Sequence, residues 1–316
     1  IAAIASARWM GRGDKEAADQ AAVDAMRDMF ETVDIDGEVV IGEGKIDEAP
    51  RLYIGEKIGT REGEVPKVDL AVDPLEGTTI IAEGRPNALS VLAVAERGSF
   101  LHAPDMYMDK LAVGPAGKDV IDINRSVQDN IRAVARVMDK SVTEVAVVIL
   151  DKPRHRKEGG LIDQVRDIGA KMKLISDGDV AGALATGLPD TGVDLLMGIG
   201  GAPEGVLAAA GLKCLGGEMQ ARLMPQNEEE ASRAEEMGIT DVNKALRMSD
   251  LVAGEKVIFS ATGVTNGEML EGVRFNGEQA VTHSLVMRSE TGTLRFVEAI
   301  HQLNQKPLAE KYLSRI

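Results

Sequence analysis

Short apolar runs alternate with amphipathic stretches along the chain, and this alternation is typical of α/β proteins. The stretch at 15–32 has helical spacing, because Ala18, Ala22 and Met26 recur on one stripe. Many of the apolar runs are uninterrupted, as in strands that are covered on both faces of a sheet. The predicted strands lie at 39–41, 68–72, 89–95, 145–150, 173–175, 195–198, 257–260 and 284–287. The sequence therefore predicts an α/β fold.

The length of 316 residues is enough for two domains of about 150 residues each. We expect one α/β domain at 1–145 and a second at 146–254, with the last strands, at about 255–298, able to return to the first domain's sheet. A charged stretch at 226–236 predicts an exposed helix. The chain begins at Ile1 without an initiator Met, and we expect further residues before it.

The composition excludes several classes of partner. The chain has 36 Lys and Arg against 51 Asp and Glu, a net charge of −15, so it lacks the basic surface that binds nucleic acids or anionic membranes. Aromatic residues make up only 3%, too few for a platform that stacks bases. No apolar run reaches the roughly 18 residues of a membrane-spanning helix. The single cysteine, Cys214, suits a reducing compartment, so we expect a cytoplasmic protein.

Acidic residues follow several of the predicted strands. In open α/β sheets ligands bind beyond the carboxyl ends of strands, so these side chains are candidates for a common site. Carboxylates gathered there repel one another unless a cation compensates their charge, and oxygen ligands alone suit a hard ion such as Mg²⁺ or Mn²⁺. The acids concerned are Glu43, Asp73, Glu76, Asp151, Asp177, Asp179 and Glu204.

Asp19 is a further candidate, because it lies on the apolar stripe of its predicted helix, three residues before Ala22. A carboxylate that faces a core needs a partner. That partner is either a metal ion or a buried Arg or Lys, unless Asp19 lies at the margin of the stripe. The residues alone leave these alternatives open.

The segment DPLEGT at 73–78 carries the sharpest pattern in the chain. Pro74 forces a turn directly after a strand, so that Asp73 and Glu76 can face one point. Gly77 lets the backbone come close, and Thr78 brings a hydroxyl to a predicted helix start, where backbone N–H groups favour a phosphate. The alternative is a plain turn in which Asp or Thr caps the helix.

A basic cluster follows the predicted strand at 145–150. Lys152 and Arg154 are candidates for holding a second, non-reacting phosphate, whereas Arg156 and Lys157 fit a solvated loop. Tyr107 could add a hydroxyl donor to that phosphate. The four histidines, among them His155, lack the spacing of metal ligands, and we interpret them as structural or surface residues.

Six motifs together resemble those of class II (GlpX-type) fructose-1,6-bisphosphatases. They are IGEG at 41–44, VDPLEGT at 72–78, APDMYM at 103–108, KPRH at 152–155, DGD at 177–179 and GIGGAPEG at 198–205, and the resemblance runs from residue 9 to about 301. The Asp-Pro-x-Asp/Glu-Gly-Thr element by itself marks only the wider lithium-sensitive superfamily, which includes inositol monophosphatases.

The resemblance implies a layered α/β sandwich and metal-dependent hydrolysis of the 1-phosphate of fructose 1,6-bisphosphate, a step of gluconeogenesis. Two Mg²⁺ or Mn²⁺ ions could both activate the attacking water and neutralise charge on the phosphoryl group, so we expect two ions. The implied metal ligands are Asp19, Glu43, Asp73, Glu76 and Glu204. The implied substrate contacts are Glu76, Gly77, Thr78, Tyr107, Lys152, Pro153, Arg154, Asp177, Gly178, Asp179 and Gly201.

The implied catalytic residues are Thr78 and Asp19. The resemblance assigns Thr78 to the activation of the attacking water. A threonine hydroxyl is a poor base by itself, so this role requires an acid, such as Asp19, to take up its proton.

Two departures from the family pattern stand out. Lys45 replaces a usual Glu, which speaks against a peripheral third metal, and residues 157–160 look like a short insertion. The small-molecule partner is expected to be a sugar bisphosphate, and the protein a homo-oligomer.

Alternatives to this function remain. One is a bifunctional fructose-1,6-/sedoheptulose-1,7-bisphosphatase, and another is an inositol or nucleotide phosphatase. A non-catalytic metal- or sugar-phosphate-binding protein is a third. A dinucleotide-binding oxidoreductase would need a G-x-G-x-x-G fingerprint, which the glycine-rich segment at 198–205 lacks.

Overall fold

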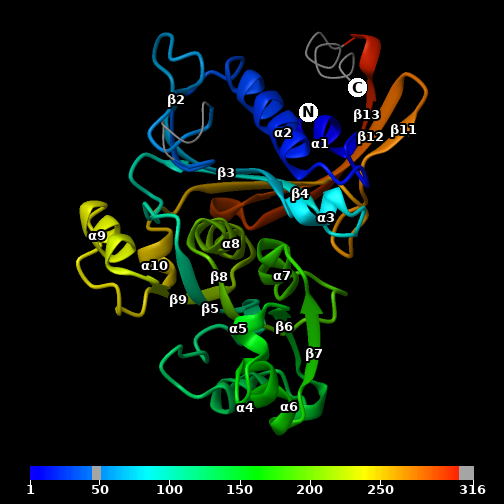
Figure 1. Ribbon diagram of the computed structural model, residues 1–316. Helices are drawn as coiled ribbons and strands as arrows, with labels where there is room; N and C mark the ends of the chain where they lie inside the picture. Colours follow the sequence, from blue (N-terminus) through cyan, green and yellow to red (C-terminus); the bar gives the residue numbers. More distant parts are fainter. Residues whose placement is uncertain (45–50, 306–316) are drawn as a thin grey trace. The chain divides into compact units, whose positions relative to one another are not determined.

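The computed structural model describes residues 1–44 and 51–305 (Figure 1). Lys45, which departs from the family pattern, lies outside the described residues. The chain forms two compact units: unit 1 combines Ile1–Ser99 with Gly254–Ile316, and unit 2 is Phe100–Ala253. None of the helices in the described parts of the chain has both the length and the apolar character needed to span a membrane.

Unit 1 is built on an eight-stranded sheet with the order β11-β12-β10-β4-β3-β1-β2, and β13 pairs with β12. Only β1 and β3 run parallel to each other; the remaining recorded pairs are antiparallel. The strands are β1 (Asp36–Ile41), β2 (Lys57–Ile58), β3 (Lys67–Glu76), β4 (Leu89–Glu96), β10 (Val257–Gly263), β11 (Arg274–Asn276), β12 (Gln279–Arg288) and β13 (Thr293–Gln302).

The helices of unit 1 are α1 (Ala2–Ala7), α2 (Lys15–Phe30) and α3 (Thr78–Ala82). In Figure 1, α1 and α2 lie side by side against the sheet, and both contact β3. Asp14 caps α2, because its Oδ1 accepts the N–H of Ala17 at 3.0 Å. The predicted stripe of α2 is buried in the core of this unit, together with Leu70 and Val72 of β3.

Unit 2 contains a five-stranded sheet with the order β7-β6-β8-β5-β9. β6 runs parallel to β7 and β8, whereas β5 is antiparallel to β8 and β9. The strands are β5 (Tyr107–Val113), β6 (Ala146–Leu150), β7 (Lys171–Ile175), β8 (Leu195–Gly201) and β9 (Glu218–Met224).

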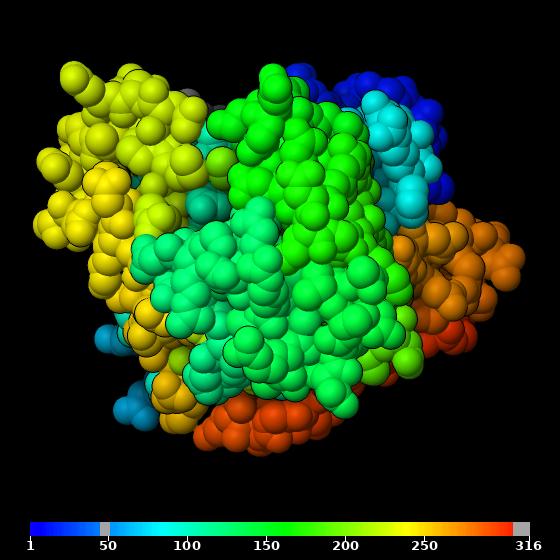
Figure 2. All heavy atoms as spheres, turned by 90° about the horizontal axis from the view of Figure 1, so that it is seen from below, coloured from blue at the N-terminus to red at the C-terminus, as the bar shows by residue number. Residues whose placement is uncertain are grey.

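Helices cover this second sheet. α4 and α6 pack together over one cluster of buried strand residues, and α7 and α8 pack against each other and against the sheet. The charged helix α9 stands at the surface, as the yellow-green part of Figure 2 shows. The helices are α4 (Val127–Val137), α5 (Pro153–Arg156), α6 (Leu161–Ile168), α7 (Asp179–Ala185), α8 (Ala202–Leu215), α9 (Glu228–Glu236) and α10 (Met248–Leu251).

The predicted α/β class is confirmed, and the two mixed sheets with their helices fit a layered α/β sandwich. Each strand expected from an apolar run is present. The sequence analysis missed β2, β5, β9, β11 and β13. β2 and β11 are only two and three residues long, and charged or polar residues interrupt the apolar pattern of the other three. β5, for example, contains Asp109 and Lys110.

The division into compact units differs from the expected domains at 1–145 and 146–254. The units divide after Ser99 and after Ala253, because β5 is hydrogen-bonded along its length to β8 and β9 and therefore belongs with them. The strands from Val257 onward belong to the sheet of unit 1.

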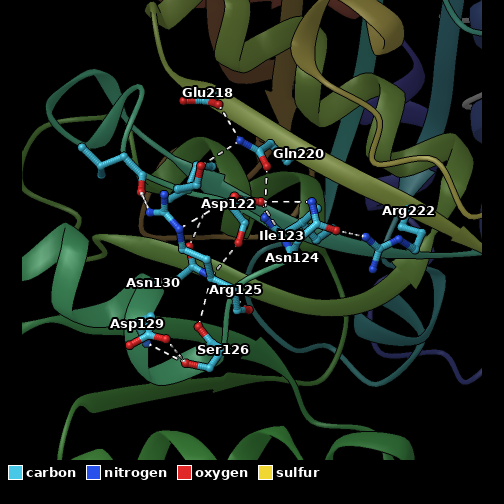
Figure 3. Close-up of polar contacts among 12 residues, drawn as sticks. Asp122, Ile123, Asn124, Arg125, Ser126, Asp129, Asn130, Glu218, Gln220 and Arg222 are labelled. Atoms are coloured by element: carbon cyan, nitrogen blue, oxygen red, sulfur yellow. Dashed lines mark hydrogen bonds and ion pairs between the residues drawn. The ribbon is translucent and has the colours of Figure 1, made fainter.

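A polar network fixes the loop at 119–126 in unit 2 (Figure 3). Buried Gln220 accepts the N–H of Ile123 at 3.0 Å and donates to the carbonyl of Ile121 at 2.8 Å. Asn130 accepts the N–H of Asp122 at 2.8 Å and donates to the carbonyl of the same residue at 2.9 Å. These side chains replace the backbone partners that an irregular segment lacks.

Candidate active site

Two neighbouring strands of unit 1 end beside each other and deliver acidic residues. β1 and β3 are parallel, with Ile41 opposite Ala71. Glu43 and Asp73 each lie two residues beyond this pair, at the same edge of the sheet. The topology thus brings together two predicted site residues that are 30 positions apart in the sequence (73 − 43).

The DPLEGT segment forms an irregular strand end. The pairing of β3 with β4 shifts between Asp73 and Glu76, because Pro74 has no N–H to give to the ladder. Oδ1 of Asp73 instead accepts the N–H of Leu75 at 3.1 Å. Glu76 is buried, with 3% of its surface exposed. The kink directs the chain from β3 straight into α3.

Gly77 is the N-cap of α3, with a φ of 89° that favours glycine. Thr78 is the first residue of the helix and is half-buried. Among the described residues, no side chain caps α3. The interpretation of Thr78 as a helix cap is therefore wrong, because its hydroxyl makes no capping hydrogen bond at the start of α3.

Asp19 lies on α2, next to Ala18 and one turn before Ala22, both of which are fully buried. Burial raises its pKa to about 6. Within the described part of the chain, no Arg or Lys forms an ion pair with it. The alternative, in which Asp19 pairs with a buried Arg or Lys, is thus not observed in the described part of the chain.

The segment that follows Glu43 is held on α2 by ion pairs. Arg51 contacts Asp28 at 2.7 Å and Asp24 at 3.2 Å, and Arg27 contacts Glu56 at 2.5 Å. The helix that carries Asp19 is therefore tied to Arg51 and Glu56.

In unit 2, three glycines of the GIGGAPEG segment each leave room for a polar side chain. A β-carbon at Gly198 would lie 3.0 Å from the ring of His155. At Gly200 it would lie 2.0 Å from Oδ2 of Asp179, and at Gly201 it would lie 1.9 Å from Oε2 of Glu204. These glycines therefore allow His155, Asp179 and Glu204 to approach the backbone closely.

His155 joins two strand ends. Its Nδ1 lies 2.7 Å from the carbonyl of Leu150, and its Nε2 lies 2.8 Å from the backbone N of Ile199. The first nitrogen must donate and the second accept, so the ring is neutral. Burial lowers the pKa of His155, in keeping with this state. The prediction of a structural histidine is confirmed, and its role is to lock the 152–156 turn onto β8.

Arg154 is oriented by two neighbours. Its Nε and Nη2 donate to the carbonyl of Ile199 at 3.0 and 2.7 Å, and its guanidinium stacks 4.5 Å from the ring centre of Tyr107. Arg156, two residues on, instead forms a paired contact with the carboxylate of Asp151. The carboxylate of Asp151 is thus paired with Arg156.

The other predicted substrate contacts lie close by. Lys152 and Pro153 begin α5, as N-cap and first residue. Gly178, with a φ of 85°, caps α7 as Gly77 caps α3. Burial raises the pKa of Asp177, and the charge of Lys152 partly offsets this.

A cavity of about 390 Å³ borders this region of unit 2. Arg125, Arg154 and Lys157 line it, together with the backbone at Gly159 and Gly160. The 157–160 segment, which the sequence analysis identified as an insertion, thus forms part of a cavity wall beside Arg154.

Lys110 is a residue that the sequence analysis missed. It is 2% exposed, and its Nζ lies 2.6 Å from Oδ2 of Asp179. Its only sequence signal is a lysine within a mostly apolar run at 106–113.

Glu204 lies in the first turn of α8, and its Oε2 is buried without a hydrogen-bond partner among the described residues. Burial raises its pKa, and the charge of Lys110 opposes this effect. A buried carboxylate oxygen in this state is suited to a cation.

The predicted metal ligands are divided between the units, with Asp19, Glu43, Asp73 and Glu76 in unit 1 and Glu204 in unit 2. In residues 1–44 and 51–305, no group of three or more Asp, Glu, His or Cys side chains is arranged to hold a metal ion. The predicted ligands are all carboxylates, which suit a hard cation. The described side chains of Asp, Glu, His and Cys do not form a group of three or more that could hold one.

Comparison with known proteins gives a consistent result. The family described as "Bacterial fructose-1,6-bisphosphatase, glpX-encoded" matches residues 1–301. A "Fructose-1,6-bisphosphatase 1 class 2" of Escherichia coli (strain K12) is 48% identical over 318 residues, which cover 96% of this chain and 93% of that protein. Class 2 fructose-1,6-bisphosphatases of Escherichia coli O6:H1 and Shigella flexneri match with the same identity and coverage.

Proposed function

The chain belongs to the glpX-encoded family of bacterial fructose-1,6-bisphosphatases, and we propose that it hydrolyses the 1-phosphate of D-fructose 1,6-bisphosphate. Water forms the new bond to phosphorus, the bond from phosphorus to the C1 oxygen breaks, and that oxygen leaves with a proton. The products are fructose 6-phosphate and inorganic phosphate. The observation that carries this conclusion is the family match over residues 1–301, which includes every candidate site residue.

The proposed metal ligands are Asp19, Glu43, Asp73, Glu76 and Glu204. Their all-oxygen chemistry supports Mg²⁺ or Mn²⁺, and Oε2 of Glu204 is buried without a hydrogen-bond partner among the described residues. Two such ions, when bound, would neutralise charge on the phosphoryl group and make water acidic enough to attack.

Thr78 and Asp19 are the proposed catalytic pair in the protein. The Thr78 hydroxyl, which makes no capping hydrogen bond in α3, would orient the attacking water at the start of that helix. Asp19 is proposed to accept a proton passed on by the hydroxyl. Glu76 and Gly77 place the backbone of this turn against the reacting phosphate.

The second phosphate is proposed to bind at the 152–154 turn. Lys152 and Arg154 supply positive charge, and Tyr107 stacks under the Arg154 guanidinium. Because Ile199 takes up Nε and Nη2, Arg154 presents its remaining N–H groups in a fixed direction.

The sugar is proposed to contact Asp177 and Asp179 of unit 2. Asp177 and Asp179 would accept hydrogen bonds from its hydroxyl groups, and Gly178 and Gly201 would allow close approach of the backbone. Pro153 starts the α5 turn and so fixes the entry of the basic residues.

The test is a phosphate-release panel with Mg²⁺ and with Mn²⁺. The substrates are fructose 1,6-bisphosphate, sedoheptulose 1,7-bisphosphate, inositol 1-phosphate and adenosine 3′,5′-bisphosphate. We expect fructose 1,6-bisphosphate to give the highest kcat/KM. Faster turnover of inositol phosphate or of the nucleotide would contradict the proposal, and equal rates on both sugar bisphosphates would make the enzyme bifunctional. Size-exclusion chromatography with light scattering tests the expected homo-oligomer.

A further inference from the structure

Lys110 lies in the middle of β5 and is buried, with 2% of its surface exposed. Its Nζ contacts Oδ2 of Asp179, the first residue of α7, at 2.6 Å. Asp179 is itself buried, with 7% exposed. The pair joins a strand to a helix start that is 69 positions away in the sequence.

The surrounding glycines leave space for this pair. A β-carbon at Gly200 would lie 2.0 Å from Oδ2 of Asp179 and 3.0 Å from Nζ of Lys110. On the next helix, a β-carbon at Gly205 would lie 3.5 Å from Cε of Lys110. Any larger residue at Gly200 would have to displace the ion pair.

Glu204 is the second acid near Lys110. The charge of Lys110 favours its ionised form, while the charge of Asp179 and burial oppose it. Oε2 of Glu204 is buried and has no hydrogen-bond partner among the described residues.

Stability alone gives no reason for a charged pair at this place. Well-packed apolar side chains of similar volume are often as stable as a buried ion pair, because both charges lose their hydration. A fixed charge is useful, however, where carboxylates must keep one orientation before a ligand arrives.

We propose that Lys110 is a positioning residue, which holds Asp179 toward the sugar. This inference rests on the proposed function, because that function gives Asp179 its role. Lys110 acts through Asp179 and does not itself contact the substrate.

The test compares the full-length enzyme with Lys110→Met, Asp179→Asn and the double variant. The matched control is Lys140→Met, which removes the partner of another buried carboxylate in unit 2, since Lys140 lies 2.5 Å from Asp194. For each protein we would measure KM and kcat for fructose 1,6-bisphosphate, the melting temperature, and the affinity of the metal-stripped protein for fructose 6-phosphate by calorimetry.

We expect Lys110→Met and Asp179→Asn each to raise KM and to weaken fructose 6-phosphate binding by about 10-fold or more, the value of one charge-assisted hydrogen bond. The double variant is expected to be no worse than the poorer single variant, because both changes break the same link. Lys140→Met is expected to lower the melting temperature and to leave KM and fructose 6-phosphate affinity unchanged.

A Lys110→Met enzyme with wild-type KM and fructose 6-phosphate affinity would overturn the inference, as would losses that multiply in the double variant. If Lys110→Met fails to fold, the double variant decides, because it removes both charges of the Lys110–Asp179 pair; wild-type affinity in that protein would refute the role of Lys110. If the wild type does not hydrolyse fructose 1,6-bisphosphate at all, the proposed function fails, and the inference with it.

Discussion

The carboxylate of Glu204 lies over the backbone of Gly201, in the space that a side chain at position 201 would fill. A β-carbon there would be 1.9 Å from Oε2. Gly201 has an ordinary φ of −69°, so glycine is required for room and not for backbone conformation. The pair places an acid in the first turn of α8, where the helix dipole favours negative charge.

Gly201→Ala is expected to displace the Glu204 carboxylate without unfolding the protein, because the clash involves the far end of a flexible side chain. We expect a melting temperature close to that of the wild type. We expect kcat/KM to fall by about 10-fold to 100-fold, with more Mg²⁺ needed for half-maximal activity, as for lost support of a metal ligand. The control is Gly187→Ala, where the nearest atom would be a Leu215 methyl at 3.1 Å. Full activity in Gly201→Ala would show that Glu204 need not hold its present position.

Thr78→Ala is expected to lower kcat by about 10²-fold to 10⁴-fold with little change in substrate affinity, because it removes one group that positions water. Thr78→Ser should restore part of the rate, since it keeps the hydroxyl but loses the β-branch that fixes the rotamer. Stability should hardly change, because Gly77 and not Thr78 caps α3. A melting loss equivalent to about 0.5–2 kcal/mol with normal turnover would indicate a capping role instead.

Arg154→Ala is expected to raise KM for fructose 1,6-bisphosphate by about 10-fold or more, because it removes a charge-assisted contact to the second phosphate. Lys152→Ala should act in the same direction. Arg156→Ala is the matched control, since Arg156 lies in the same turn but pairs with Asp151. Hydrolysis of a simple monophosphate should change little in any of these variants. Equal losses on both substrates would place Arg154 outside the site for the second phosphate.

Asp19 is expected to make the metal-free protein less stable as pH rises. Burial raises its pKa from 3.8 to about 6, so between these values the folded state binds more protons than the unfolded state. Unfolding free energy therefore falls as pH rises from about 4 to about 6 and stays low above that range. Asp19→Asn removes this penalty, which is at most about 3 kcal/mol at pH 7.

The measurement is urea unfolding of metal-free wild type and Asp19→Asn at pH 4 and pH 7. The variant should gain stability at pH 7 and little at pH 4. An equal difference at both pH values would show that Asp19 does not titrate in the folded protein as its burial suggests.

Exhaustive chelation is expected to abolish turnover, because the proposed site leaves no other group to neutralise charge on the phosphoryl oxygens. Mg²⁺ or Mn²⁺ should restore it. The rate of phosphate release before chelation, after it and after metal is added back checks this expectation. Undiminished activity in protein shown by elemental analysis to be metal-free would exclude the two-ion mechanism.

The sequence by itself determined the α/β class, most of the buried strands and the acids at the strand ends. These features are local, because a strand or an amphipathic helix leaves a periodic pattern in its own residues. The six motifs also carried the family resemblance and hence the candidate site. The position of Asp19 on the apolar stripe of α2 indicated that its side chain faces the core, but the sequence did not indicate which group would be its partner.

Tertiary structure alone decided which distant groups meet. The Lys110–Asp179 pair spans 69 positions, and the bond of His155 to Ile199 spans 44. Such contacts follow from strand order and helix packing, and they leave no periodic pattern in the sequence. The charged residues Asp109 and Lys110 also interrupt the apolar run of β5, so the sequence did not predict that strand. The glycines show the same limit, because the space that Gly200 and Gly201 leave is used by side chains from other positions, which only the folded chain brings there.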